Sequence, residues 1–200
     1  MATFILLPYA VTGTNEWEDP SGGACAASNV DNDNDNVDYC SEPTNSHEIT
    51  FTMAAPSVAE AAIDEISSVR ISLSAAYTAT SGAGTPVRSY MEAGGSSTIS
   101  NGYNTHTIAI GDSYTTYNGD VESYATGTTD WTYQNLEDLE IRLDKIFNTQ
   151  SRKIVKVSYL YVTVTYTAAG YGHGVIGIDS GDISKVNGIA TADISKVNGV

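Results

Sequence analysis

The segment Lys153–Thr167 is rich in Val, Tyr and Thr and contains neither Gly nor Pro. This composition favours an extended strand over a helix. Its apolar side chains fall on both alternating faces, with Val155, Val157, Tyr159 and Tyr161 on one and Leu160, Val162, Val164 and Tyr166 on the other. A strand that is apolar on both faces lies between two layers, or between a sheet and a neighbouring subunit. The chain is therefore predicted to build layers of β-sheet around this segment.

Other strands recur along the chain. In Ser67–Tyr77 apolar residues alternate with Arg and Ser, the period of two that indicates a half-buried strand. Further strands are predicted at Thr3–Leu7, His47–Met53, Val87–Met91, Thr105–Ile110 and Leu139–Asp144. Residues 11–46 are predicted to form a long structured loop, and only Ala55–Ile66 leans towards a helix. The pattern predicts an all-β chain: an antiparallel β-sandwich, jelly-roll-like, with an extended C-terminal tail.

The end of the chain carries a duplication. Asp182–Ile189 recurs as Asp193–Val200 with only the final residue changed. We predict a sandwich domain over residues 1–167, a Gly-rich linker over 168–181 and a duplicated docking tail over 182–200. The Asn-Gly pair in each copy favours a tight turn. The apolar residues expected to contact a neighbouring molecule are Ile183, Val186, Ile189, Ile194, Val197 and Val200. The alternative is a low-complexity tail without a docking role.

The net charge of −15 is unevenly distributed, because residues 1–69 hold twelve acidic side chains and no Lys or Arg. Such a field repels phosphates, so nucleic acid and anionic membranes are excluded as expected partners. We find no signal-peptide pattern and no apolar run long enough to span a bilayer. The chain is expected to be made in the cytosol and to be soluble, with Cys25 and Cys40 as free thiols rather than a disulfide.

An acidic loop is the candidate metal site. Asp31, Asp33 and Asp35 alternate, and Glu42 stands at the twelfth position counted from Asp31, which are ligand positions of an EF-hand calcium loop. Asn36 replaces the usual Gly and the flanks are not helical, so an EF-hand itself is not expected. Two interpretations stay open: a calcium-stabilised loop of a β-sandwich, and a solvated acidic turn.

Catalysis is not expected. The three histidines are far apart in sequence, and the chain has no Gly-x-Ser-x-Gly elbow, phosphate loop or Cys-x-x-Cys pair. A cluster of aromatic residues is dense enough to suggest a sugar-stacking platform: Tyr103, Tyr114, Tyr117, Tyr124, Trp131 and Tyr133. Tyrosines that pad strands and subunit contacts explain the same residues without a ligand, and this is the interpretation we favour from sequence.

Several segments show a resemblance to known proteins. Trp131–Ile141 followed by Val155–Tyr166 resembles the closing hairpin of a jelly-roll domain common in virion proteins of tailed bacteriophages. Ser113–Tyr117 also matches that pattern, as does Trp17 ahead of an Asp/Asn-rich loop. The tail is similar to Ile-x-Lys-Val-Asn-Gly-Val endings on structural proteins of marine and environmental phages. The chain departs from the family at Arg142, where Gly is common.

The resemblance, which covers roughly residues 3–167 and the tail, implies a non-enzymatic structural protein of the virion, made in the host cytoplasm. The first expectation is a capsid decoration or cement protein anchored by its C-terminal tail, and a tail or fibre component is the second. The implied partners are other virion proteins, such as the major capsid protein or tail proteins, and further copies of the chain in a homo-oligomer. The rival interpretation is a carbohydrate-binding module that reads host glycans. No cofactor is required, calcium being the one candidate.

Overall fold

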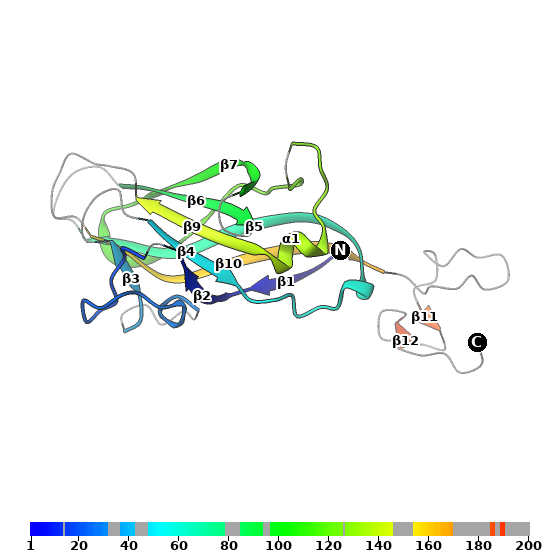
Figure 1. The fold of residues 1–200 in the computed structure, drawn as a ribbon, viewed down its shortest axis with the longest axis horizontal. Coiled ribbons are helices and arrows are strands. Elements are labelled where there is room, and N and C mark those ends of the chain that lie inside the picture. The colour runs from blue at the N-terminus through cyan, green and yellow to red at the C-terminus, as the bar shows by residue number, and fades with distance from the viewer. Residues whose placement is uncertain are drawn as a thin grey trace.

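The computed structural model of the chain is an antiparallel β-sandwich of two five-stranded sheets (Figure 1). The structure describes residues 1–13, 15–31, 37–42, 48–78, 85–93, 97–125, 127–145, 154–169, 185–186 and 189–190. In those ranges, no helix is long and apolar enough to cross a membrane. The predicted fold class, a jelly-roll-like β-sandwich, is confirmed.

The first layer, sheet A, has the strand order β1 (Ala2–Leu6), β10 (Ile154–Ala168), β5 (Ile63–Thr78) and β8 (Gly111–Asn118), with β3 (Cys40–Glu42) also paired to β10. The second layer, sheet B, has the order β2 (Pro8–Thr12), β4 (Glu48–Met53), β9 (Leu139–Lys145), β6 (Thr85–Ala93) and β7 (Ser97–Ile108). The core lies between the two sheets and includes Phe51, Ile71, Leu73, Ile141 and Leu160, all fully buried.

A β-bulge changes which face of β10 is buried. The pairing of β10 with β5 shifts between Val157 and Tyr159. Before the shift Val155 and Val157 are buried, and after it Leu160, Val162 and Val164 are buried. One extra residue reverses the alternation of faces, so these two apolar sets enter the same core. The prediction that β10 is apolar on both faces was therefore wrong: the strand has one core face, and Tyr159 and Tyr161 lie on the other.

Three short segments share one edge of β10. β1 pairs with Val162–Tyr166, and β3 pairs with Val155–Val157. Between them the Leu160 amide donates to the Val30 carbonyl at 2.9 Å, and Asp31 forms an isolated bridge with Tyr159. The region predicted as a loop over residues 11–46 therefore contributes β3 and part of β2, and it covers a sheet edge that would otherwise be open to pairing.

Cys25 and Cys40 form a disulfide, so the prediction of free thiols was wrong. Backbone hydrogen bonds join Glu18 and Ser41 in both directions at 2.8 Å, and the Cys25 amide donates to Trp17 at 3.0 Å. These contacts bring the two Cα atoms to 5.5 Å, within the range of disulfide geometry. The prediction was based on the expected cytosolic compartment, and no sequence pattern indicates that Cys25 and Cys40 lie close together in space.

The helix suggested for Ala55–Ile66 does not form. A single 3-10 turn, η2 (Glu60–Ala62), leads directly into β5, whose first residue Ile63 pairs with Ala168 of β10. Long-range strand pairing thus overrides a weak local preference for helix. The described helices are two 3-10 turns, the other being η1 (Ala27–Asn29), and the short α1 (Tyr133–Glu137).

The first copy of the repeat contains a hairpin. β11 (Lys185–Val186) pairs antiparallel with β12 (Ile189–Ala190), with Val186 opposite Ile189. The intervening Asn-Gly pair, for which a tight turn is predicted, lies outside the described residues. Figure 1 shows β11 and β12 beyond the end of the sandwich. Ile183, Ile194, Val197 and Val200 lie outside the described residues, and docking by the tail stays a prediction.

Candidate functional site

The outer face of sheet B carries an ordered set of polar and aromatic side chains. Strand alternation turns Phe51, Met91 and Ile141 into the core and their neighbours outwards. In register, Tyr103 of β7 lies opposite Tyr90 of β6, and Tyr90 lies opposite Arg142 of β9. Arg88 is two residues before Tyr90 and points to the same side, since residues i and i+2 share a face.

These four residues form a stacked group, which we call the tyrosine–arginine platform: Arg88, Tyr90, Tyr103 and Arg142. The two tyrosine ring centroids are 5.5 Å apart and the rings are tilted by 52°. The guanidinium carbon of Arg142 lies 3.9 Å from the Tyr90 ring centroid, and that of Arg88 lies 4.4 Å from the Tyr103 ring centroid. Both distances are in the range of cation–π attraction, which here orients each arginine against a ring.

Carboxylates fix the arginines from the side. Arg142 Nε lies 3.0 Å from Glu92 Oε1, and its Nη1 lies 3.1 Å from Glu48 Oε2. Burial lowers the pKa of Arg142. The hydrogen bond and charge of Glu92, and the charges of Glu48 and Tyr90, raise it by more, so the pKa of Arg142 is above its ordinary value. Arg142 and the Tyr90 ring on which it stacks are therefore held in place before any ligand arrives, which reduces the entropy lost on binding.

Arg88 is held more loosely. Its Nη1 lies 3.9 Å from Asp144 Oδ2, a longer ion pair than those of Arg142. A hydrogen bond with the Tyr90 side chain is the main cause that raises the pKa of Arg88. The Arg88 side chain is 32% exposed. Since the Asp144 contact is long, this guanidinium is the member of the platform best placed to donate to a ligand.

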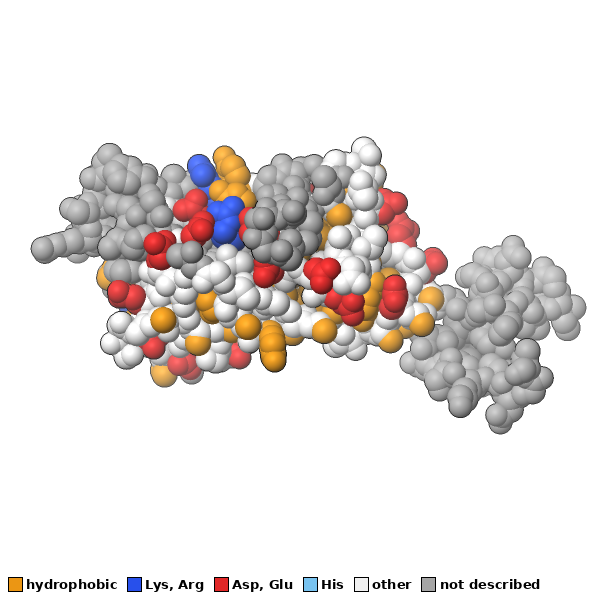
Figure 2. All heavy atoms as spheres, viewed as in Figure 1, with side chains coloured by type: hydrophobic (Ala, Val, Ile, Leu, Met, Phe, Trp, Pro, Cys, Tyr) orange, Lys and Arg blue, Asp and Glu red, His pale blue; other side chains and the backbone are white. Residues whose placement is uncertain are grey.

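The platform is open to solvent. Tyr103 is 51% exposed, which is unusual for a large side chain that is already packed by two neighbours. In Figure 2, blue, orange and red side chains gather over the region of β6 and β9. A rigid aromatic surface bordered by hydrogen-bonding groups can stack against a flat apolar face and bind hydroxyl groups around its rim.

The six aromatic residues predicted as one cluster are dispersed. Tyr103 belongs to the platform, whereas Tyr114 and Tyr117 lie on β8 of sheet A, where the Tyr117 hydroxyl accepts from the Ala109 amide at 2.9 Å. Tyr124 is exposed after β8, and Trp131 is buried ahead of Tyr133, the first residue of α1. Sequence reasoning missed Arg88, Tyr90 and Arg142. The sequence pattern that could have identified them is the alternation Arg88-x-Tyr90-x-Glu92 and Glu140-x-Arg142-x-Asp144, which places these polar and aromatic residues on one face of each strand.

The acidic residues proposed as calcium ligands are not assembled in the described structure. Glu42 is buried in β3, where its Oε2 lies 2.6 Å from Lys145 Nζ. Asp31 lies in the bridge to Tyr159, and Asp33 and Asp35 lie outside the described residues. The described part of the chain holds no group of three or more His, Cys, Asp or Glu that could bind a metal ion. Glu42 thus has a lysine as its counter-ion, and calcium binding by the loop stays a prediction.

One histidine is buried in the core. His106 on β7 is 3% exposed, and its Nε2 lies 2.8 Å from Ser89 Oγ. Burial lowers the pKa of His106 to about 4, although the charge of Asp120 acts in the opposite direction. Ser89 is fully buried, so a substrate cannot reach this serine–histidine pair. His47 and His173 lie outside the described residues.

Comparison with known proteins finds no matching family model and no matching curated protein. Among solved structures, the chain is similar to the CBM36-1 domain of a multidomain xylanase from the hindgut metagenome of Trinervitermes trinervoides (11% identity, TM-score 0.40, covering 87% of this chain and all of that one). It is also similar to the C-terminal CBM6 of LamC, a marine laminarinase from Zobellia galactanivorans. That match has 12% identity and a TM-score of 0.40, and it covers 82% of this chain and 99% of the other. A third structure, a CBM4, has 10% identity and a TM-score of 0.37, covering 82% of this chain and 94% of its own. CBM denotes a carbohydrate-binding module. At these identities and TM-scores the likeness carries no weight for function.

Proposed function

We propose that the protein is a non-catalytic binding module that binds neutral glycans on the outer face of sheet B. The observation that carries the proposal is Tyr103, half exposed yet fixed in place by Tyr90 and Arg88. A ring held in this way offers a large contact area with little conformational entropy left to lose.

The chemistry of the platform matches that of a sugar. A pyranose ring has an apolar face of C–H groups and a rim of hydroxyl groups. The Tyr103 ring can pack against the face, while the Arg88 guanidinium donates to hydroxyl oxygens and Asp144 accepts from hydroxyl groups. A few placed polar groups around an aromatic surface are typical of small-ligand sites.

The charge of the face favours an uncharged ligand. Arg88 and Arg142 contribute two positive charges, whereas Glu48, Glu92, Glu140 and Asp144 contribute four negative ones. The chain as a whole has a net charge of −15. Glycans with carboxylate or sulfate groups would meet a repulsive field, so neutral glycans are the expected class.

Affinity electrophoresis in gels that contain neutral or acidic polysaccharides tests this proposal. Retardation by a neutral polysaccharide is expected, together with at least a tenfold weaker affinity for Tyr103→Ala, equivalent to about 1.4 kcal/mol. Tyr124→Ala is the matched control, because Tyr124 is also exposed but lies off the platform. Equal retardation of Tyr103→Ala and wild type would disprove the platform as the glycan site.

A second candidate function is that of a virion structural protein, as a capsid decoration protein or a tail or fibre component. The duplicated segment favours it, because two copies of a hairpin-forming sequence offer two equivalent contacts to neighbouring subunits. Deletion of residues 179–200 is expected to abolish incorporation into particles. Normal incorporation of the shortened chain would remove the docking role of the tail.

A further inference from the structure

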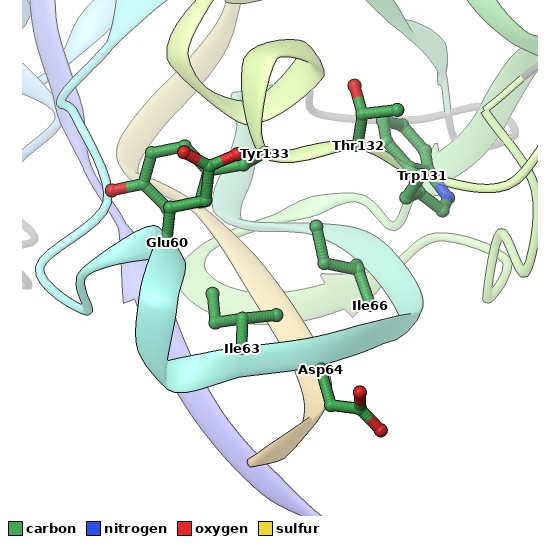
Figure 3. Close-up of a pocket in the computed structure, with 7 residues that line it drawn as sticks. All are labelled: Glu60, Ile63, Asp64, Ile66, Trp131, Thr132 and Tyr133. Atoms are coloured by element: carbon green, nitrogen blue, oxygen red, sulfur yellow. The ribbon is translucent and has the colours of Figure 1, made fainter. Parts of the chain in front are cut away.

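A pocket lies at the start of β5, and none of its lining residues belongs to the platform. Its volume is about 250 Å³, and its lining includes Glu60, Ile63, Asp64, Ile66, Trp131 and Tyr133 (Figure 3). Sites for whole small-molecule ligands are usually about 300–1,000 Å³. The pocket is therefore suited to a single long side chain with its immediate neighbours.

The aromatic walls are fixed by their own polar atoms. Trp131 Nε1 donates to the Glu122 carbonyl at 3.0 Å, and the Tyr133 hydroxyl donates to the Val58 carbonyl at 3.0 Å. Trp131 also forms a backbone bridge with Ile66. Both polar groups are thus engaged within the chain. Trp131 is buried, and the partly exposed Tyr133 ring is the aromatic surface that an occupant can reach.

The rim is acidic. Glu60 and Asp64 are both exposed, and the residues that line the pocket include no Lys or Arg. Figure 3 shows Glu60 and Tyr133 on one side of the pocket, with Asp64 on the other side and directed away from it. Carboxylates next to aromatic rings attract an ammonium group both by charge and by cation–π interaction.

The chain leaves the sandwich at this pocket. Ala168 ends β10 opposite Ile63, and the Ala169 amide donates to the Ala62 carbonyl at 3.0 Å. The tail that follows contains two basic residues, Lys185 and Lys196, which are the only Lys or Arg after Lys156. Each lysine is part of the same four-residue sequence, Ile-Ser-Lys-Val, in which apolar residues flank the polar pair.

We propose that this pocket binds the Ile-Ser-Lys-Val repeat of a neighbouring copy of the chain. The lysine ammonium pairs with Glu60, Asp64 adds to the negative charge around the pocket, and the aliphatic stem of the lysine packs along Tyr133. The Ile or Val of the repeat contacts Ile63.

The count of sites allows one such contact per pocket. Every copy of the chain contributes this pocket once and the repeat twice. A repeat that occupied its own pocket would leave no pocket free for a neighbour, so self-association distinguishes the proposed contact from binding within one chain. A contact between two different surfaces is heterologous, and it generates rings or open chains of subunits rather than a two-fold dimer.

Charge reversal tests the proposal by complementation. The first variant carries Glu60→Lys and Asp64→Lys, and the second carries Lys185→Glu and Lys196→Glu. Analytical ultracentrifugation of each variant alone is expected to show at least tenfold weaker self-association than wild type. In an equal mixture, the reversed pocket meets the reversed tail and the native pocket meets the native tail, so association is expected to return. Glu137→Lys is the control, because Glu137 is exposed on α1 and does not line the pocket.

Three results would overturn the proposal: wild-type protein that stays monomeric, variants that associate as wild type does, or a mixture that stays monomeric. Circular dichroism melting of each variant confirms that it is folded. The inference does not depend on glycan binding. The Glu60→Lys, Asp64→Lys variant is expected to keep the glycan affinity of wild type, and Tyr103→Ala is expected to keep its self-association.

Discussion

At the scale of single residues, His106 makes stability depend on pH. Its pKa falls from an ordinary 6.5 to about 4 in the folded chain, because burial disfavours the charged imidazolium. Between these two values the unfolded chain binds a proton that the folded chain does not. The contribution of His106 is therefore fully present above pH 6.5 and is lost as the pH falls towards 4. The loss amounts to about 3 kcal/mol of the free energy of unfolding at 1.36 kcal/mol per pH unit.

Replacement by glutamine isolates this contribution. His106→Gln keeps a hydrogen-bonding partner for Ser89 but does not titrate. Urea unfolding from pH 7 to pH 4 is expected to show a steeper decline for wild type than for the variant, since carboxylates titrate equally in both. Parallel curves over that range would mean that His106 does not titrate as its burial implies.

At the scale of elements, sequence periodicity located most strands but not their edges. β1, β4, β5, β6, β7, β9 and β10 all overlap predicted strands, because alternating or continuous apolar runs are a strong local signal. The prediction of which β10 residues share a face was nevertheless wrong, because the bulge between Val157 and Tyr159 cannot be recognised from the amino-acid composition of the strand. β3 depends on pairing with distant β10, and the Cys25–Cys40 disulfide depends on the pairing of Glu18 with Ser41. No local pattern reports such contacts.

The platform shows the same division between local and long-range information. Period two predicts that Arg142 and Asp144 share one face of a strand. It does not predict that Tyr90 lies next to Arg142 and Tyr103, because that needs the order β9-β6-β7 and its register. Tyr103 was identified within a wider aromatic group, whose other members the fold separates. Proximity in sequence between residues 103 and 133 was therefore a poor guide to proximity in space.

At the scale of the whole molecule, the two proposed contacts affect different properties of one assembly: the affinity of each binding site and the number of linked sites. Under the two proposals, the platform would determine how tightly one subunit binds a sugar, and the pocket with its repeat would determine how many platforms are joined. Linked sites bind a polymer more tightly than a single site does, by roughly 10²–10⁴-fold in favourable geometry. A short oligosaccharide occupies one platform and gains nothing from the linkage.

Lys185→Glu with Lys196→Glu is therefore expected to weaken binding to an immobilised neutral polysaccharide by at least tenfold while its affinity for a short oligosaccharide of the same sugar stays unchanged. Surface plasmon resonance on the polymer and isothermal titration calorimetry with the oligosaccharide give the two values. The charge-reversed pocket, Glu60→Lys with Asp64→Lys, should behave in the same way, and mixing the two variants should restore polymer binding, because each supplies the surface that the other lacks. A fall in oligosaccharide affinity would instead mean that the tail contributes to the glycan site itself, and unchanged polymer binding would mean that subunits bind it independently.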